Sequence, residues 1–238
     1  MKSVRSVLLA PILGLIFSIQ AVSGDILITE IMYNPRIAAG GDLPNEYVEI
    51  YNSGPVAVDL TGWKLSDEDS NAGDWGLISG VLGPGQVGVI TEFSEADFKS
   101  SWSTATDAVI FTVSGWASLA NGATDTNEIL EILDASSLSV DVANYSVSAP
   151  WPEPSINGNA IYLLPGNFTQ AGNDDGANWA HAVGGVDGAI ELLVTTGVYD
   201  DGNIGSPGYV MVVPEPSVFA LVMGSLAFAG LMIRRRLR

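Results

Sequence analysis

Few residues in this chain of 238 could carry out chemistry as a catalytic group. His181 is the only histidine and there is no cysteine. This composition excludes a cysteine nucleophile, a thiolate zinc site and a histidine metal cluster. His181 could serve as the base of a serine hydrolase, but no Gly-x-Ser-x-Gly elbow accompanies it. We therefore expect no catalytic residues, although a pair of carboxylates suited to glycoside hydrolysis is not excluded by the sequence.

Three clusters rich in Asp and Asn could bind calcium, which takes six to eight oxygen ligands. The first cluster does not follow the EF-hand pattern, because Ala72 stands where that loop requires glycine. Asp and Asn are also ordinary turn residues, so solvated turns are the alternative. No other cofactor is expected. The aspartates of the calcium hypothesis are Asp67, Asp69, Asp74, Asp174, Asp175, Asp200 and Asp201.

Tryptophans in polar or Gly/Pro-rich surroundings could stack on the sugar rings of a polysaccharide. The alternative is that these rings fold back onto the ends of the domain and bury their apolar surface. The residues concerned are Trp75, Trp102, Trp116 and Trp151.

The charge of the chain is strongly negative, with 27 acidic and 9 basic residues. Six of the basic residues lie at the two ends, which leaves Arg36, Lys64 and Lys99 against 26 acidic residues between Asp25 and Val213. Such a surface repels phosphate backbones, so a nucleic-acid partner is excluded.

The first 23 residues predict a secretory signal peptide. Lys2 and Arg5 precede an apolar run over 7–19, and Ala21 and Ser23 supply the small residues of a cleavage site. The apolar run is too short to span a bilayer. The segment therefore predicts export through the secretion translocon and removal by signal peptidase; a retained anchor is the alternative.

The C-terminal segment 213–238 has a different pattern. Val213-Pro214-Glu215-Pro216 is followed by an uncharged, mostly apolar stretch over 217–233, which predicts a transmembrane helix of minimal length. The basic cluster Arg234, Arg235, Arg236 and Arg238 should stay on the cytoplasmic side, so the acidic body should be exported.

These three features, in this order, resemble the PEP-CTERM sorting signal of Gram-negative envelopes. The resemblance implies that an exosortase recognises the tail and processes it near the Pro-Glu-Pro element. It also implies a protein first anchored in the inner membrane with its C-terminus in the cytoplasm, and then placed on the envelope surface or outside the cell.

Residues 24–212 predict one all-β domain with enlarged loops. Short apolar runs separated by turn residues are typical of an antiparallel β-sandwich. A helix is expected over 94–99, with Ser94 as its N-cap. In 47–51 the alternation places Glu49 outward, and we expect Glu30, Glu46 and Glu49 to be solvated or, alternatively, to brace loops by accepting backbone N–H groups. The expected strands are 26–31, 47–51, 56–60, 87–90, 109–113, 129–133, 140–145, 161–164 and 191–194.

The domain also resembles the lamin-tail family. The resemblance is strongest at the start and continues in later pieces, which include a Gly83-Pro84-Gly85 turn and a closing Gly205-Ser206-Pro207-Gly208. It implies an immunoglobulin-like sandwich that binds or tethers and carries no catalytic residues. The matching segments are 26–35, 45–54, 58–67, 83–85, 128–134, 178–180 and 205–208.

Together these features predict a noncatalytic exported protein whose sandwich binds matrix polysaccharide or a surface partner. Two alternatives are a matrix protein that assembles with itself, with calcium bridging its acidic loops, and an accessory to a secreted hydrolase.

Overall fold

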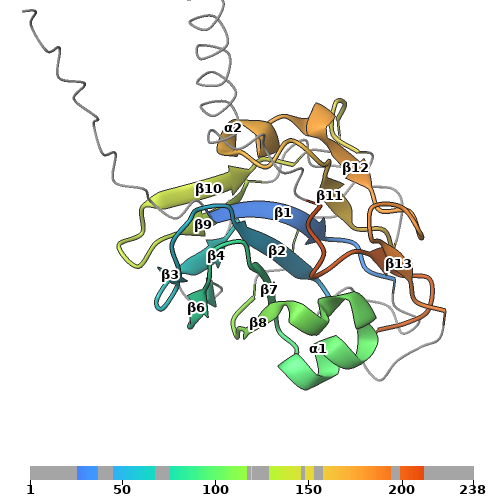
Figure 1. The fold of residues 1–238 in the computed structure, drawn as a ribbon, viewed down its shortest axis with the longest axis horizontal. Helices are drawn as coiled ribbons and strands as arrows, with labels where there is room; N and C mark the ends of the chain where they lie inside the picture. Colours follow the sequence, from blue (N-terminus) through green and yellow to red (C-terminus); the bar gives the residue numbers. More distant parts are fainter. Residues whose placement is uncertain are drawn as a thin grey trace, which may run out of the picture.

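A six-stranded sheet forms the centre of the fold (Figure 1). Its strand order is β12-β11-β1-β2-β7-β8. The bounds are β1 (Ile26–Met32), β2 (Tyr47–Asn52), β7 (Val87–Thr91), β8 (Val109–Thr112), β11 (Ile161–Leu163) and β12 (Trp179–His181). The computed structural model describes residues 26–36, 45–67, 75–116, 119, 129–145, 148–152, 158–193 and 199–211.

One pair of strands in this sheet departs from the predicted antiparallel arrangement. β7 and β8 are parallel, whereas the other pairs of the sheet are antiparallel. A parallel pair needs a crossover connection. Here it contains α1 (Glu95–Ser101) and the 3-10 helix η1 (Ser103–Asp107), and Figure 1 shows α1 beside this edge of the sheet.

A second, four-stranded sheet packs against the first. Its order is β10-β9-β4-β5, and all its pairs are antiparallel. The core between the sheets contains Ile28 and Ile50 from the large sheet and Leu65 and Ile132 from the small one. The chain is therefore mostly β-strands in sheets, consistent with an immunoglobulin-like β-sandwich. The bounds are β4 (Lys64–Ser66), β5 (Gly76–Leu77), β9 (Leu130–Leu133) and β10 (Ser139–Ala143).

The remaining elements are short. Two small sheets pair β3 (Val58–Asp59) with β6 (Val81–Leu82), and β13 (Ile190–Glu191) with β14 (Ile204–Gly205). A one-turn helix α2 (Gln170–Asn173) precedes the 3-10 helix η2 (Gly176–Asn178).

The helix predicted over 94–99 is confirmed as α1. The Ser94 hydroxyl accepts a hydrogen bond from the Asp97 N–H at 3.2 Å. This contact satisfies one of the N–H groups that a helix start leaves without a partner.

The second face of the large sheet is also buried. Met32, Tyr47 and Val89 on this face pack with Phe98 of α1 and with Trp102. Figure 1 shows α1 and the segment after β13 near the same side of β2 and β7. The expectation that Glu49 faces solvent is therefore wrong, since further layers cover this face.

No helix within the described ranges is both long and apolar enough to cross a membrane. The predicted signal peptide (1–23), the transmembrane helix (217–233) and the sorting motif (213–216) lie outside the described residues.

A substitution at Gly88 of β7 tests the packing between the two sheets. A Cβ there would lie 2.6 Å from the Phe111 ring and 3.2 Å from Ile50. We expect Gly88→Ala to lower the free energy of unfolding by about 1–3 kcal/mol, because the ring must move within a packed core. Urea denaturation measures this change.

The matched control is Gly184→Ala, where the nearest atom lies at 3.5 Å from the added Cβ. Its stability should stay within about 0.5 kcal/mol of the parent. Equal stabilities of the two variants would contradict the packing described here.

Candidate functional site

A β-bulge in β1 determines where the candidate site lies. Ile26 and Ile28 face the core between the sheets, but after the bulge Ile31 faces it instead. An inserted residue shifts the alternation of a strand by one. Glu30 and Met32 therefore point to the opposite face.

Two buried polar side chains hold the bulge. Asp141 of β10 accepts hydrogen bonds on Oδ2 from the Ile28 N–H at 2.7 Å and from Asn173 Nδ2 at 2.6 Å. Asn173 Nδ2 also donates to the Ile28 carbonyl oxygen at 3.3 Å. The backbone of Ile28 thus has side-chain partners in place of a neighbouring strand, as buried backbone groups require.

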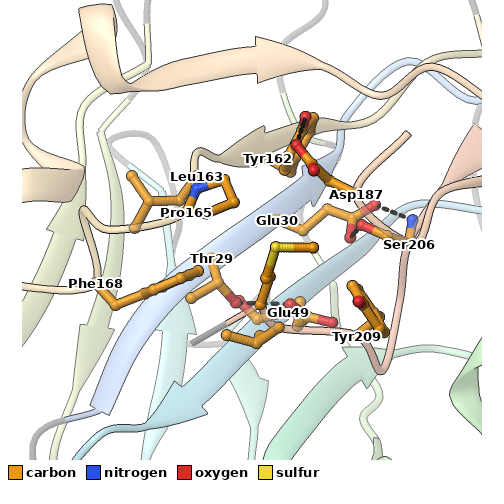
Figure 2. A pocket seen from close by; sticks show the side chains of 12 residues that line it. Thr29, Glu30, Glu49, Tyr162, Leu163, Pro165, Phe168, Asp187, Ser206 and Tyr209 are labelled. Atoms are coloured by element: carbon orange, nitrogen blue, oxygen red, sulfur yellow. Dashed lines mark hydrogen bonds between the residues drawn. The ribbon is translucent and has the colours of Figure 1, made fainter. Parts of the chain in front are cut away.

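Glu30 and Glu49 lie opposite each other in the register of β1 and β2, and both are buried. We call them the Glu30–Glu49 pair. Glu30 accepts from the Tyr47 hydroxyl at 2.8 Å, from the Ser206 N–H at 2.8 Å and from the Ser206 hydroxyl at 2.7 Å. Glu49 accepts from the Thr29 hydroxyl and from the Gly208 N–H, both at 2.7 Å. Figure 2 shows Glu30 with Ser206 and Glu49 with Thr29.

The donors Ser206 and Gly208 belong to residues 204–211, which we call the closing segment. A Cβ at Gly205 would overlap the Tyr47 hydroxyl oxygen, and a Cβ at Gly208 would lie 2.7 Å from backbone atoms of Thr104 and Ala105. Gly208 also has φ +91°, a conformation that favours glycine. Glycine at these two positions therefore permits the close approach of Gly205 to Tyr47 and Glu30, and of Gly208 to the backbone of Thr104 and Ala105.

Glu46 also accepts hydrogen bonds in a buried position, but its donors come from the loop that contains Trp116 and Leu119. Its Oε2 accepts from the Trp116 indole N–H at 2.9 Å and from the Leu119 N–H at 3.0 Å. The prediction that Glu30, Glu46 and Glu49 are solvated is therefore wrong. The alternative is confirmed, because each glutamate accepts a backbone N–H from a loop or from the closing segment.

Burial changes the acidity of these groups. It raises the pKa of Glu30, against the lowering effect of its hydrogen bonds from Ser206 and Tyr47. Burial also raises the pKa of Glu49 well above its usual value, and the charge of Glu30 raises it further. Burial raises the pKa of Asp141 to about 7, although the hydrogen bonds from Ile28 and Asn173 oppose this shift.

A small pocket lies beside the Glu30–Glu49 pair (Figure 2). Phe168 and Tyr209 lie on its walls, together with Tyr162, whose hydroxyl donates to Asp187 at 2.7 Å. The cavity volume is about 10 Å³, which is room for about one water molecule. The pocket is far too small for a sugar ring.

The structure corrects the prediction of sugar stacking for two of the four tryptophans. Trp102 is fully buried and packs edge-on against Tyr47 and Tyr199, and Trp116 is 8% exposed with its N–H on Glu46. Their polar sequence neighbours do not reveal this tertiary packing. Neither ring is accessible to a ligand.

Trp75 and Trp151 are half-buried and keep part of their surface in solvent. Lys64 Nζ lies 4.7 Å from the centroid of the Trp75 ring. Trp151 packs against Trp179 with ring centroids 5.5 Å apart. These two residues remain candidates for sugar stacking.

The described aspartates of the calcium hypothesis do not come together. No group of three or more acidic or histidine side chains is placed to hold a metal ion in the part of the chain that the structure describes. Asp175 instead caps η2 by accepting from the Ala177 N–H at 3.0 Å. Asp67, Asp174, Asp200 and Asp201 are the other described members, whereas Asp69 and Asp74 lie outside the described residues.

The fold defines the class of protein as an immunoglobulin-like β-sandwich. The family model of the lamin tail domain matches residues 19–146, more than half of the chain. The chain therefore belongs to the lamin tail domain family, whose immunoglobulin-like domain is structural and not typically catalytic. No curated protein matches the chain in sequence.

The fold continues beyond the matched residues. β11 and β12 follow residue 146 in the chain, yet they extend the same sheet as β1. The closing segment, also beyond the match, binds Glu30 and Glu49 within it. The later residues are therefore part of the same packed structure.

Asp141→Asn tests the raised pKa of the residue that holds the bulge. The folded protein keeps a proton on Asp141 that the unfolded chain releases above about pH 4, so this group makes stability fall as pH rises from about 4 to about 7. Asparagine still offers an oxygen to the Ile28 N–H but does not titrate. We expect the free energy of unfolding of the variant to fall less than that of the parent between about pH 4 and about pH 7. Urea denaturation across this pH range measures the difference.

Glu191→Gln is the matched control, because Glu191 is an exposed carboxylate. It should leave the pH dependence of the parent unchanged. If Asp141→Asn and the parent lose stability in parallel as pH rises, Asp141 does not hold a proton in the folded protein.

Proposed function

We propose that this chain is a noncatalytic protein exported to the cell envelope or beyond it, in which the sandwich binds or tethers and residues 213–238 act as a sorting signal. The observation that carries this proposal is the attachment of the closing segment to the sheet. Met211, the last described residue, lies only two positions before Val213. The C-terminal segment therefore leaves from a part of the chain that is fixed to the fold.

The proposed delivery follows from the two ends of the sequence. The secretion translocon and signal peptidase handle residues 1–23, and an exosortase recognises Val213-Pro214-Glu215-Pro216. The basic cluster at Arg234–Arg236 and Arg238 stays in the cytoplasm while the acidic body crosses the inner membrane of a Gram-negative-type bacterium. Processing then leaves the body on the envelope surface or outside the cell.

The buried carboxylates support a noncatalytic role. A glycoside hydrolase needs two carboxylates that reach a sugar ring. Glu30 and Glu49 are the adjacent buried pair, but protein donors occupy their oxygens and the pocket beside them has a volume of about 10 Å³. Their geometry suits fixing a chain segment better than cleaving a substrate.

The proposed ligand class is an extracellular matrix polysaccharide. Trp75 and Trp151 are the half-exposed rings available to stack on sugars. The strong negative charge of the body disfavours anionic ligands and favours neutral or cationic glycans.

The sorting proposal is tested by cell fractionation of the full chain with a tag in the exported body. We expect a membrane-bound precursor that converts into a shorter envelope or extracellular form. Replacing Pro214, Glu215 and Pro216 with alanine should leave the full-length chain in the inner membrane.

The chain itself provides the control, because Pro152-Glu153-Pro154 repeats the same tripeptide away from the apolar segment. Alanine substitutions there should leave processing unchanged. An intact chain free in the cytosol would contradict the proposed delivery.

The glycan proposal is tested by retention of the full chain on neutral polysaccharide. We expect Trp75→Ala to weaken retention by up to about tenfold, since an aromatic contact contributes about 0.5–1.5 kcal/mol. Leu77→Ala is the control, because it removes a nearby apolar side chain that is exposed to solvent. Equal retention of the parent and both variants would remove Trp75 from the binding surface.

A further inference from the structure

The Glu30–Glu49 pair has no positive partner among the described residues. Each hydrogen bond described to it comes from a neutral group, either a hydroxyl or a backbone N–H. The ion pair between Lys99 and Glu95 lies on α1 and does not involve the pair. Nothing described therefore compensates two negative charges at this position.

The other titratable groups around the pair are also neutral or acidic. Tyr47 donates to Glu30 from β2, and Tyr162 of β11 holds Asp187 at the same pocket. Tyr209 comes from the closing segment itself, and Tyr199 packs behind Tyr47 through Phe98 and Trp102. Two like charges in a buried site oppose each other, so such a pair holds its last proton strongly.

The part of the closing segment from 206 to 211 depends on this pair. Ile204 is fixed independently, because its N–H donates to the Gly158 carbonyl and its carbonyl accepts from Ala160. The described hydrogen bonds from residues 206–211 to the rest of the protein all end on Glu30 or Glu49. A change in the pair therefore acts directly on Ser206 and Gly208, the two residues that donate to it.

We propose that the Glu30–Glu49 pair keeps a proton in the folded protein and acts as a pH-sensitive latch, which releases residues 206–211 when both carboxylates ionise. Release exposes the two charges to bulk water, whereas the closed arrangement leaves room beside them for about one water molecule. Ile204 and Gly205 stay paired with β13 as strand β14, so the rest of the fold remains in place.

The direction of the switch follows from the acidity of the two groups. Burial raises the pKa of both glutamates, and the charge of Glu30 adds to the effect on Glu49. The closed state therefore binds more protons than the open state, and its stability falls as pH rises. The latch is closed in acid and opens toward alkaline pH.

The latch also bears on the proposed sorting signal. It controls how firmly the chain is held just before Val213. This consequence rests on the proposed function, whereas the latch itself does not.

The test is a carboxyl ¹³C NMR titration of the full chain in detergent, combined with exchange rates of the Ser206 and Gly208 amides. We expect at least one carboxyl of the pair to titrate above the ordinary pKa of an exposed glutamate, which is about 4.3. Across the same midpoint the two amides should exchange about tenfold faster after correction for intrinsic base catalysis.

Glu49→Gln keeps an oxygen for the Gly208 N–H and removes the second charge, so it should abolish the pH dependence of amide exchange. If Glu49→Gln does not fold, Glu30→Gln can replace it, because it removes the other of the two carboxylate charges. Glu191→Gln should behave like the parent. The proposal is overturned if both carboxyls of the pair titrate at the ordinary pKa of an exposed glutamate, or if the two amides keep their protection through the titration.

Discussion

Two carboxylates buried on one face of a sheet impose the main constraint on this fold. Glu30 and Glu49 each need hydrogen-bond donors, because a buried carboxylate without partners is strongly unfavourable. Several of these donors come from Ser206 and Gly208, almost at the end of the described chain. The first two long strands are thus completed by a segment that is more than 150 residues away in sequence.

The position of Glu30 depends in turn on the bulge in β1. Asp141 and Asn173 hold the backbone of Ile28 on one side of the strand, and the shifted alternation directs Glu30 to the other side. The core between the sheets and the second buried face are therefore connected through a single irregular position. The pocket beside the pair has little free volume, so this region acts as an attachment point rather than as a ligand cavity.

The sequence predicts the long elements well and the site poorly. β1 and β2 follow from their apolar residues, and α1 follows from Ser94, because these signals are local. Other strands have only two or three residues each, which is too short to show an alternation of apolar and polar residues. These strands are β4, β5, β6, β12 and β14. Alternation assigns Glu49 to a face but does not say what covers that face. Nothing in the run from Ile26 to Met32 marks the bulge, which depends on side chains from β10 and α2.

The contact of Ser206 with Glu30 fixes the closing segment to the sheet. A double-mutant cycle with Glu30→Gln and Ser206→Ala, followed by urea denaturation of the full chain, measures this contact most directly. We expect a coupling free energy of about 1–3 kcal/mol between the two positions, as for residues in one buried network. Additive effects of the two substitutions would contradict it.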